Sequence, residues 1–369
     1  MHWKDIGFMA IYIINIISLF FIGGLLFKCS FNEVQINTRI AKKIVTVYFI
    51  VVFGLFLALR NKSVGPDTLL YCNIFKEIGN GWGISEYFNK FPGYALYNTV
   101  VAFWWGNSEQ VIIFFNAIIT ISIIAIISYK ISDNLVMTLF YYIGFSFYPA
   151  TFNIARQSMS VALSLIMYYF LVKEKRIKAL FIMLLAISIH NSAIVLVVIY
   201  ILYIFRHKFN RKILVYGVGI GGILATCYEK IILFFIKIFP SYSGYIGENG
   251  VMVVEHSNGN RIIIAFILIM VIFYALLKLR GDNTDKEIIF MMIMTEIAIF
   301  MMFVFINNVI MFRLVDYFLI YIIYLIPNLL EKYEKRQFKI WIYLPSILIM
   351  GFSSCMAFSR LLPYKFFWQ

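Results

Sequence analysis

Uninterrupted apolar runs of about twenty residues recur along the whole chain, and this feature excludes most folds. The runs lie at 6–27, 44–59, 110–129, 135–150, 157–172, 177–205, 212–226, 262–279, 288–306, 310–330 and 340–357. A membrane-crossing helix needs roughly 17–25 apolar residues, whereas the strands of a transmembrane β-barrel alternate apolar and polar residues. The chain is 62% hydrophobic and only 14% charged. The sequence therefore predicts an all-α polytopic membrane protein.

Basic loops set the expected topology. Four of them stand out, at 28–43, 173–178, 206–212 and 331–339. Loops rich in Lys and Arg stay in the cytoplasm. All four are cytoplasmic only if the short apolar stretch 93–105 dips into the membrane and returns, and if 177–205 splits into two legs at the polar residues 190–192. We therefore expect about 12 transmembrane helices, with both termini outside, plus a short re-entrant or interfacial helix.

The net charge of +14 is then mainly a topology signal, and it requires no nucleic-acid partner. The four cysteines are scattered, form no CxxC pair, and indicate neither a metal site nor a cofactor.

Two longer polar segments, 60–92 and 227–260, fall outside the membrane in this arrangement. We expect them to cover the active-site face of a single transmembrane domain, 1–369. The first is rich in glycine, which predicts a segment rich in turns. In the second, Glu229, Lys230 and Lys237 interrupt an apolar run, which is typical of an amphipathic helix on the membrane surface. The glycines that follow predict a flexible loop.

Charged residues near hydrocarbon are costly unless paired or hydrated, so they are candidate site residues. Arg60 follows the second span, and Asp67 and Tyr71 are one helical turn apart. Arg156 and Gln157 follow a helix break at Pro149, and the start of a helix is a poor place for a lone cation. A bound anion would resolve that conflict. The alternative for both arginines is snorkelling to the membrane interface.

Three further groups complete the candidates. His190 and Ser192 lie at the expected bend, where a histidine is suited to proton transfer or to sugar binding, or else packs as a hydrogen-bonded residue. Arg313, Asp316 and Tyr317 are spaced to share one helical face, where the arginine and aspartate could simply pair. Glu296 lies deep in a span, and the sequence assigns it no role.

The arginines are expected at the external face, although they come from separate helices. Guanidinium groups gathered in a partly desolvated cleft repel one another, and a multivalent anion relieves that repulsion. A pyrophosphate-linked lipid fits such a place, with its tail between helices and its sugars in the external segments.

Short motifs along the chain resemble the EpsG branch of the Wzy-like O-antigen and exopolysaccharide polymerases. They are Arg60 with Gly65-Pro66-Asp67, Tyr71 and Phe75; Pro92-Gly93-Tyr94-Ala95-Leu96-Tyr97-Asn98; Asn153 to Ser160, with Arg156-Gln157; Ile187 to Ala193, with His190-Asn191-Ser192; Arg313 with Tyr317; and Pro363-Tyr364-Lys365. The similarity runs from about residue 50 to the end. The family often carries an acidic residue before the Pro-Gly of the dipping segment, where this chain has Phe91.

The resemblance implies a polysaccharide polymerase of the bacterial inner membrane with an outward-facing active site. Such an enzyme transfers a growing glycan from undecaprenyl diphosphate to another lipid-linked repeat unit, in exopolysaccharide, capsule or O-antigen synthesis. It implies catalytic roles for Arg156, His190, Arg313 and Asp67. Substrate-binding roles would fall to Arg60, Tyr71, Gln157, Ser192 and Tyr317. The partners implied are the undecaprenyl-diphosphate-linked oligosaccharide, the lipid bilayer, and a chain-length regulator and flippase of the same pathway.

Two other functions stay open from the sequence. An O-antigen ligase-like glycosyltransferase would use the same leaving group and a different acceptor, although a ligase commonly has a longer external loop than 227–260. A flippase for lipid-linked oligosaccharide would carry polar residues through the full depth of the membrane and show repeat symmetry. Here the polar residues concentrate near the outer side, and no repeat is evident.

Overall fold

A computed structural model describes residues 3–29, 38–225, 227, 230, 233–234, 237, 259–279, 285–305 and 309–369. Within these ranges the chain is helical and contains no named β-strand, which confirms the all-α expectation. The chain divides into two compact units. The first comprises Met1–Ile194 and Arg336–Gln369, and the second comprises Val195–Lys335. The single transmembrane domain stays a prediction.

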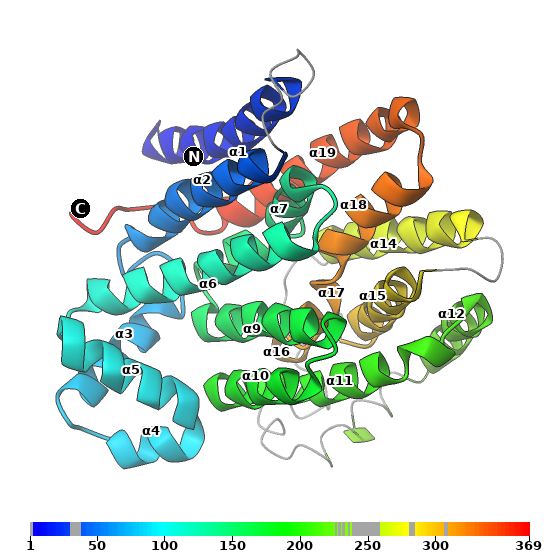
Figure 1. Cartoon of the computed structure of the whole chain (residues 1–369). Helices are drawn as coiled ribbons and strands as arrows, with labels where there is room; N and C mark the ends of the chain where they lie inside the picture. Colours follow the sequence, from blue (N-terminus) through cyan, green and yellow to red (C-terminus); the bar gives the residue numbers. More distant parts are fainter. Residues whose placement is uncertain are drawn as a thin grey trace. The chain divides into compact units, whose positions relative to one another are not determined.

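The first unit holds most of the candidate residues. Its helices are α1 (Trp3–Cys29), α2 (Thr38–Ala58), α3 (Thr68–Gly79), α4 (Ile84–Lys90), α5 (Pro92–Trp105), α6 (Glu109–Ile131), α7 (Leu135–Gly144), α8 (Phe147–Thr151), α9 (Ala155–Val172), α10 (Arg176–Ile189) and α19 (Arg336–Ser359). Helices α2, α6, α9 and α10 pack side by side in that order (Figure 1). Small and polar residues line these contacts, as is usual between membrane helices: Gly54 faces Ile118, and Ser160 donates to the carbonyl of Ala186 at 3.0 Å.

The second unit consists of shorter helices. They are α11 (Leu196–Ile204), α12 (Arg211–Ala225), α14 (Gly259–Lys278), α15 (Lys286–Val304), α16 (Val309–Phe312), α17 (Val315–Leu319) and α18 (Ile322–Tyr333). Helix α15 packs against α12, α14, α17 and α18, and it is the central element of this unit.

Five helices in the described part of the chain are long and apolar enough to cross a membrane: α1, α2, α6, α15 and α19. Shorter apolar helices include Leu135–Gly144, Asn191–Ile204 and Ile264–Lys278. About 12 crossings therefore stays a prediction. The expected amphipathic helix and most of segment 227–260 lie outside the described residues.

The break expected at 190–192 is present, whereas the break expected at Pro149 lies elsewhere, because Pro149 is within α8. Helix α10 ends at Ile189, His190 has extended backbone, and a 3-10 helix follows over Asn191–Val195. The apolar run 135–150 is also interrupted, because Ser146 adopts a left-handed conformation with φ of 67° between α7 and α8. Helix α9 then begins at Ala155, so Arg156 lies in its first turn, as predicted.

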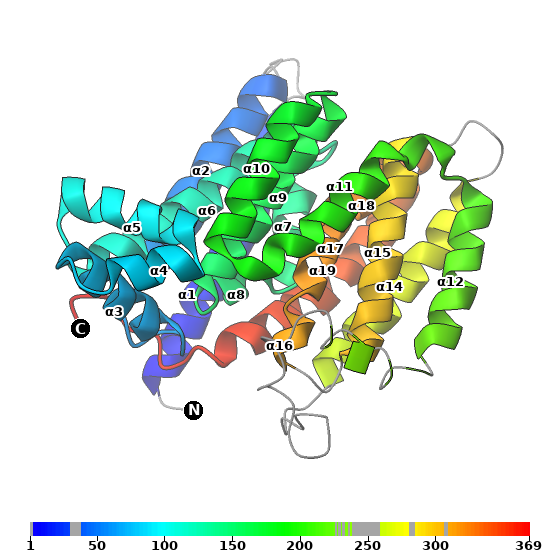
Figure 2. The ribbon, with the colours of Figure 1, turned by 90° about the horizontal axis from the view of Figure 1, so that it is seen from below.

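Segment 60–92 differs from the turn-rich reading. It contains α3 and α4, joined by glycines of which Gly81 and Gly83 have positive φ. The expected dipping stretch is the 14-residue helix α5, with Pro92 at its start. Helices α3 and α5 pack on each other and on α6, and α5 also contacts α10 (Figure 2).

The C-terminal tail lies beside the end of α2. Arg60 and Phe366 form an isolated antiparallel bridge, and the amide of Asn61 donates to the carbonyl of Lys365 at 2.8 Å. The buried Tyr364 stacks on Phe56 with ring centroids 4.7 Å apart and donates its hydroxyl to the Phe56 carbonyl at 2.6 Å. The tail is therefore fixed to the segment that leads to Asp67.

Candidate functional site

Arg156 lies at the start of α9 with an unusual set of contacts. Its guanidinium carbon lies 4.0 Å from the centroid of the Phe91 ring and 5.2 Å from that of Tyr94. The side chain is half-buried, and its Nε is buried without a hydrogen-bond partner. No carboxylate among the described residues forms an ion pair with it. A cation at the positive end of a helix, held by aromatic rings, favours an anionic ligand.

His190 is the polar neighbour of Arg156. Nη2 of Arg156 lies 3.5 Å from Nδ1 of His190, a long hydrogen bond. A guanidinium only donates, so this contact is a hydrogen bond in the tautomer whose Nδ1 carries no proton. The break after α10 carries His190 to this position, 34 residues further along the chain. The structure thus joins two candidates that the sequence placed on separate helices.

Phe91 and Tyr94 are the two aromatic residues whose rings contact the guanidinium of Arg156. They come from the start of α5, and their rings contact each other edge to face at 6.1 Å. Close packing fixes this helix start, because a Cβ atom added to Gly93 would lie 2.0 Å from the Ser188 hydroxyl. Phe91 therefore contacts the guanidinium without neutralising its charge. The sequence marked Phe91 as a departure but did not predict this contact.

Asp67 reaches the same region through its backbone. Its amide donates to Oδ1 of Asn153 at 2.7 Å, three residues before Arg156. Gly65 makes the approach possible, because its φ is 90° and a Cβ there would lie 2.0 Å from the Phe152 carbonyl oxygen. The segment bearing Asp67 is therefore docked on the chain that enters α9.

Tyr71 follows one helical turn later, as predicted. Its amide donates to the Asp67 carbonyl at 3.2 Å. Its buried ring meets Tyr94 edge to face, with centroids 6.3 Å apart. Tyr71 thus supports the ring that lies under Arg156.

Arg60 occupies a different environment from Arg156. It is 2% exposed, donates from Nη1 to the Leu57 carbonyl at 2.7 Å, and lies 5.5 Å from the Phe152 ring centroid. Burial lowers the pKa of Arg60 to about 10, so it stays charged at neutral pH. These contacts hold the end of α2 against Phe152. Its expected contact with substrate stays a prediction.

Gln157 and Ser192 lie next to Arg156 and to the His190 bend. Their side chains are buried, at 1% and 5% exposure. Gln157 lies in α9 and Ser192 in the 3-10 helix, and their expected role in orienting substrate stays a prediction.

One comparison with known proteins decides the family. The model of the EpsG family matches residues 43–366, which is nearly the whole chain. The chain belongs to the EpsG family. It is thus a polysaccharide polymerase-like membrane protein, as the resemblance implied. No curated protein and no solved structure matches it.

Arg313 and Tyr317 of this EpsG-family protein belong to the second unit. The expectation of one continuous helical face is wrong, because the run 310–330 forms α16, α17 and α18, and Arg313 lies in the turn between the first two. Tyr317 is fully buried in α17, and Asp316 is half-buried. The convergence of Arg313 with Arg156 and Arg60 stays a prediction.

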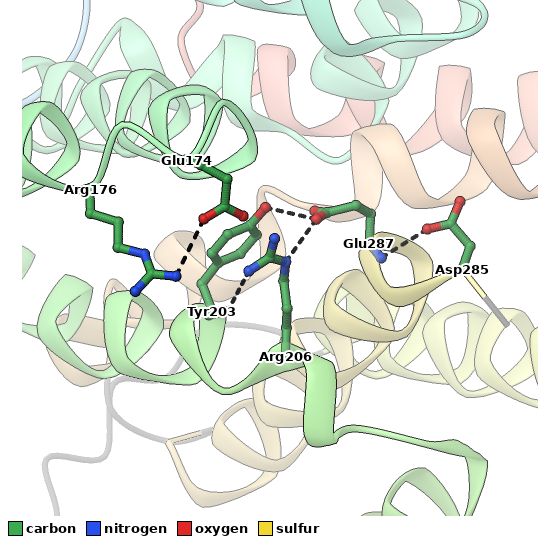
Figure 3. Close-up of polar contacts among 6 residues, drawn as sticks. All are labelled: Glu174, Arg176, Tyr203, Arg206, Asp285 and Glu287. Atoms are coloured by element: carbon green, nitrogen blue, oxygen red, sulfur yellow. Dashed lines mark hydrogen bonds and ion pairs between the residues drawn. The ribbon is translucent and has the colours of Figure 1, made fainter.

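The second unit of the EpsG-family chain also contains a polar cluster that the sequence did not predict. Glu287 accepts hydrogen bonds from the Tyr203 hydroxyl at 2.7 Å and from Nε of Arg206 at 3.0 Å (Figure 3). The carboxylate of Asp285 caps the amide of Glu287 at 2.9 Å. These contacts fasten the end of α11 to the start of α15. Arg206 therefore has a structural partner besides its contribution to the positive-inside signal.

Proposed function

We propose that this protein polymerises undecaprenyl-diphosphate-linked repeat units at the outer face of the bacterial inner membrane. The growing glycan on one lipid is transferred to the non-reducing sugar of another lipid-linked unit. Membership of the EpsG family supports the polymerase class. The finer assignment rests on the chemistry of Arg156 and its neighbours.

The observation that carries the proposal is that the half-buried Arg156 forms no ion pair with a carboxylate of the described residues. Arg156 stands on Phe91 and Tyr94, and its described neighbours supply no carboxylate. Guanidinium binds phosphate through two parallel hydrogen bonds, and the first turn of α9 adds helix-dipole attraction. A diphosphate is therefore the group that fits here.

The reaction breaks the bond between the anomeric carbon and the diphosphate oxygen and forms a bond from that carbon to the acceptor hydroxyl oxygen. The diphosphate leaves with the bonding electrons and gains negative charge as the bond breaks. Arg156 stabilises that developing charge more than the charge of the ground state, which lowers the barrier. Undecaprenyl diphosphate is the leaving group.

The acceptor hydroxyl must lose a proton in this transfer. His190 is our first choice as base, because its imidazole lies beside Arg156 and histidine is suited to proton transfer near neutral pH. When Arg156 turns its donors to the diphosphate, Nδ1 of His190 becomes available to accept that proton. Asp67, on the adjoining segment, is the second choice.

The other candidates complete the proposed site. Arg313 is proposed as a second cation for the diphosphate, and Arg60 is the next choice. Tyr71, Gln157, Ser192 and Tyr317 are proposed to orient sugars or phosphates. A flippase that delivers the lipid-linked unit and a chain-length regulator are the proposed partners.

The test replaces Arg156 and follows surface glycan on gels. The expected result for Arg156→Ala is loss of the multi-repeat ladder while single-unit product persists. Arg156→Lys should recover it only in part, because an ammonium lacks the bidentate fork. Arg176→Ala is the matched control, since Arg176 is exposed and lies at the start of α10, where it pairs with Glu174 at 3.4 Å.

An unchanged ladder in the Arg156→Ala strain would remove this residue from the mechanism. Loss of all surface sugar, including single units, would instead favour the flippase. The level of each variant in the membrane is measured alongside, so that a folding defect is not mistaken for lost chemistry.

A further inference from the structure

A basic pocket lies at the other end of α2, α6 and α9 from Arg156. Its lining residues are Thr38, Arg39, Lys42, Tyr129, Lys130, Tyr169 and Lys173. Four of the seven are cations and none is acidic. The hollow measures about 380 Å³, enough for a phosphate-bearing headgroup. Three helices contribute to it, so the pocket is a product of their packing.

Two of these lysines share one aromatic ring. Nζ of Lys130 lies 4.8 Å from the Tyr169 ring centroid, and Nζ of Lys173 lies 6.0 Å from it. Neither lysine forms an ion pair with a carboxylate in the part of the chain that the structure describes. Two ammonium groups held near one ring repel each other, and an anion between them would relieve that repulsion.

The first turn of α2 also contributes cations to this pocket. It carries Arg39 and Lys42 and contains no acidic residue. Cations at the positive end of a helix are unfavourable. Lys42 is held there by a hydrogen bond from its Nζ to the Ser132 carbonyl at 3.0 Å, which fixes it at the pocket. Lys42 and the two lysines near Tyr169 thus point to one negatively charged ligand.

The position of the pocket indicates the source of that ligand. Helices α2 and α6 are candidate membrane spans, and the pocket lies at their ends, where a membrane interface would be. Tyr129 and Tyr169 are the residue type that favours that interface. The exposed Ile40 and Ile126, on the same two helices, offer apolar surface to acyl chains.

We propose that this pocket binds the phosphate of an anionic phospholipid headgroup. Basic pockets between membrane helices on the cytoplasmic side suit such lipids. Helix α9 carries Arg156 in its first turn and Lys173 just beyond its end, which sets the two about 25 Å apart at 1.5 Å per residue. The lipid site is therefore separate from the diphosphate site, and it does not rest on the proposed polymerisation.

The test measures lipid retention by native mass spectrometry of the purified full-length protein in neutral detergent. The probes are phosphatidylglycerol, phosphatidylcholine and inorganic phosphate. Wild-type protein should retain phosphatidylglycerol about tenfold or more tightly than phosphatidylcholine. The K130Q/K173Q double variant should weaken retention of phosphatidylglycerol roughly thirtyfold, since each lysine near a lipid surface contributes about 1 kcal/mol.

The matched control is K175Q/K178Q, which removes the same charge from exposed positions that do not line the pocket. This control should retain phosphatidylglycerol like the wild type, and K130R/K173R should retain most of it. If the double glutamine variant cannot be purified, the single variants K130Q and K173Q are expected to weaken binding about fivefold each.

Three results would overturn the proposal. One is equal retention of the two lipids by the wild type. Another is equal loss in K175Q/K178Q, which would reflect general surface charge. The third is displacement of phosphatidylglycerol by millimolar inorganic phosphate, which would make free phosphate the ligand.

Discussion

At the scale of single residues, the main finding is the aromatic ring that contacts Arg156. The centroid of the Phe91 ring lies 4.0 Å from the guanidinium carbon of Arg156. An acid there would pair with Arg156 and compete with an anionic ligand. A ring attracts the cation and leaves its hydrogen-bond donors available for a ligand.

Replacing Phe91 tests that account. Phe91→Leu keeps an apolar side chain but removes the π face, and we expect a several-fold loss of polymer, since a cation–π contact is worth about 0.5–2 kcal/mol. Phe91→Tyr should stay close to the wild type. The measurement is the ladder length and yield on gels of surface glycan.

The control on the same helix is Phe103→Leu, because Phe103 is 79% exposed and contacts none of these residues. Wild-type polymer from Phe91→Leu would show that the ring contributes only packing.

At the scale of elements, the site depends on how closely α5 approaches α10. Gly93 lets the two helices touch at Ser188, and the start of α5 supplies both rings beneath Arg156. On the other side, Gly65 lets the segment before α3 dock on the Phe152 carbonyl. Two glycines thus bring segments distant in the chain to the first turn of α9.

Gly93→Ala should disrupt the site without touching a charged residue. The new Cβ would meet the Ser188 hydroxyl at 2.0 Å, so α5 must shift and carry Phe91 away from Arg156. We expect polymer yield to fall about tenfold or more, as small displacements at a reacting centre often cause. The double variant Gly93→Ala with Ser188→Gly should recover part of the activity.

The matched control for that substitution is Gly24→Ala, since Gly24 is also helical but has no atom within 4 Å of an added Cβ. If Gly93→Ala polymerised like the wild type, close contact between α5 and α10 would not matter for the site.

At the scale of the whole molecule, the prediction concerns membrane orientation. The proposed site requires the Arg156 end of α9 to face outward and the basic pocket at its other end to face the cytoplasm. Each variant carries a single cysteine, because the four native cysteines are first replaced. In intact cells, an impermeant thiol reagent should label Ser85→Cys and should not label Lys175→Cys. Both positions are exposed, so access to solvent within the protein is matched.

Labelling of Lys175→Cys from outside would invert the topology and with it the proposed site. Lysed cells provide the positive control, in which both positions should react equally.

Much of the fold could be predicted from the sequence because apolar length and charge act locally. The apolar runs predicted both ends of α6 and α9 and the end of α2 closely, although α2 begins earlier than predicted, at Thr38, and the polar residues at 190–192 predicted the break after α10. The structure of the glycine-rich segment 60–92 was not predicted correctly. Its glycines indicated turns throughout, whereas they join the two helices α3 and α4. The broken run at 310–330 was missed because hydrophobicity alone does not distinguish one helix from three.

The sequence by itself determined that this is a helical membrane protein, which end of each long helix is basic, and which charged residues are costly enough to be functional. Only the tertiary structure decided which of those residues meet. It joined Arg156 to His190 and Phe91, and it placed Arg60 beneath the C-terminal tail. The physical reason is that burial and charge follow from composition along the chain, whereas contacts between distant segments depend on close packing at positions such as Gly65 and Gly93.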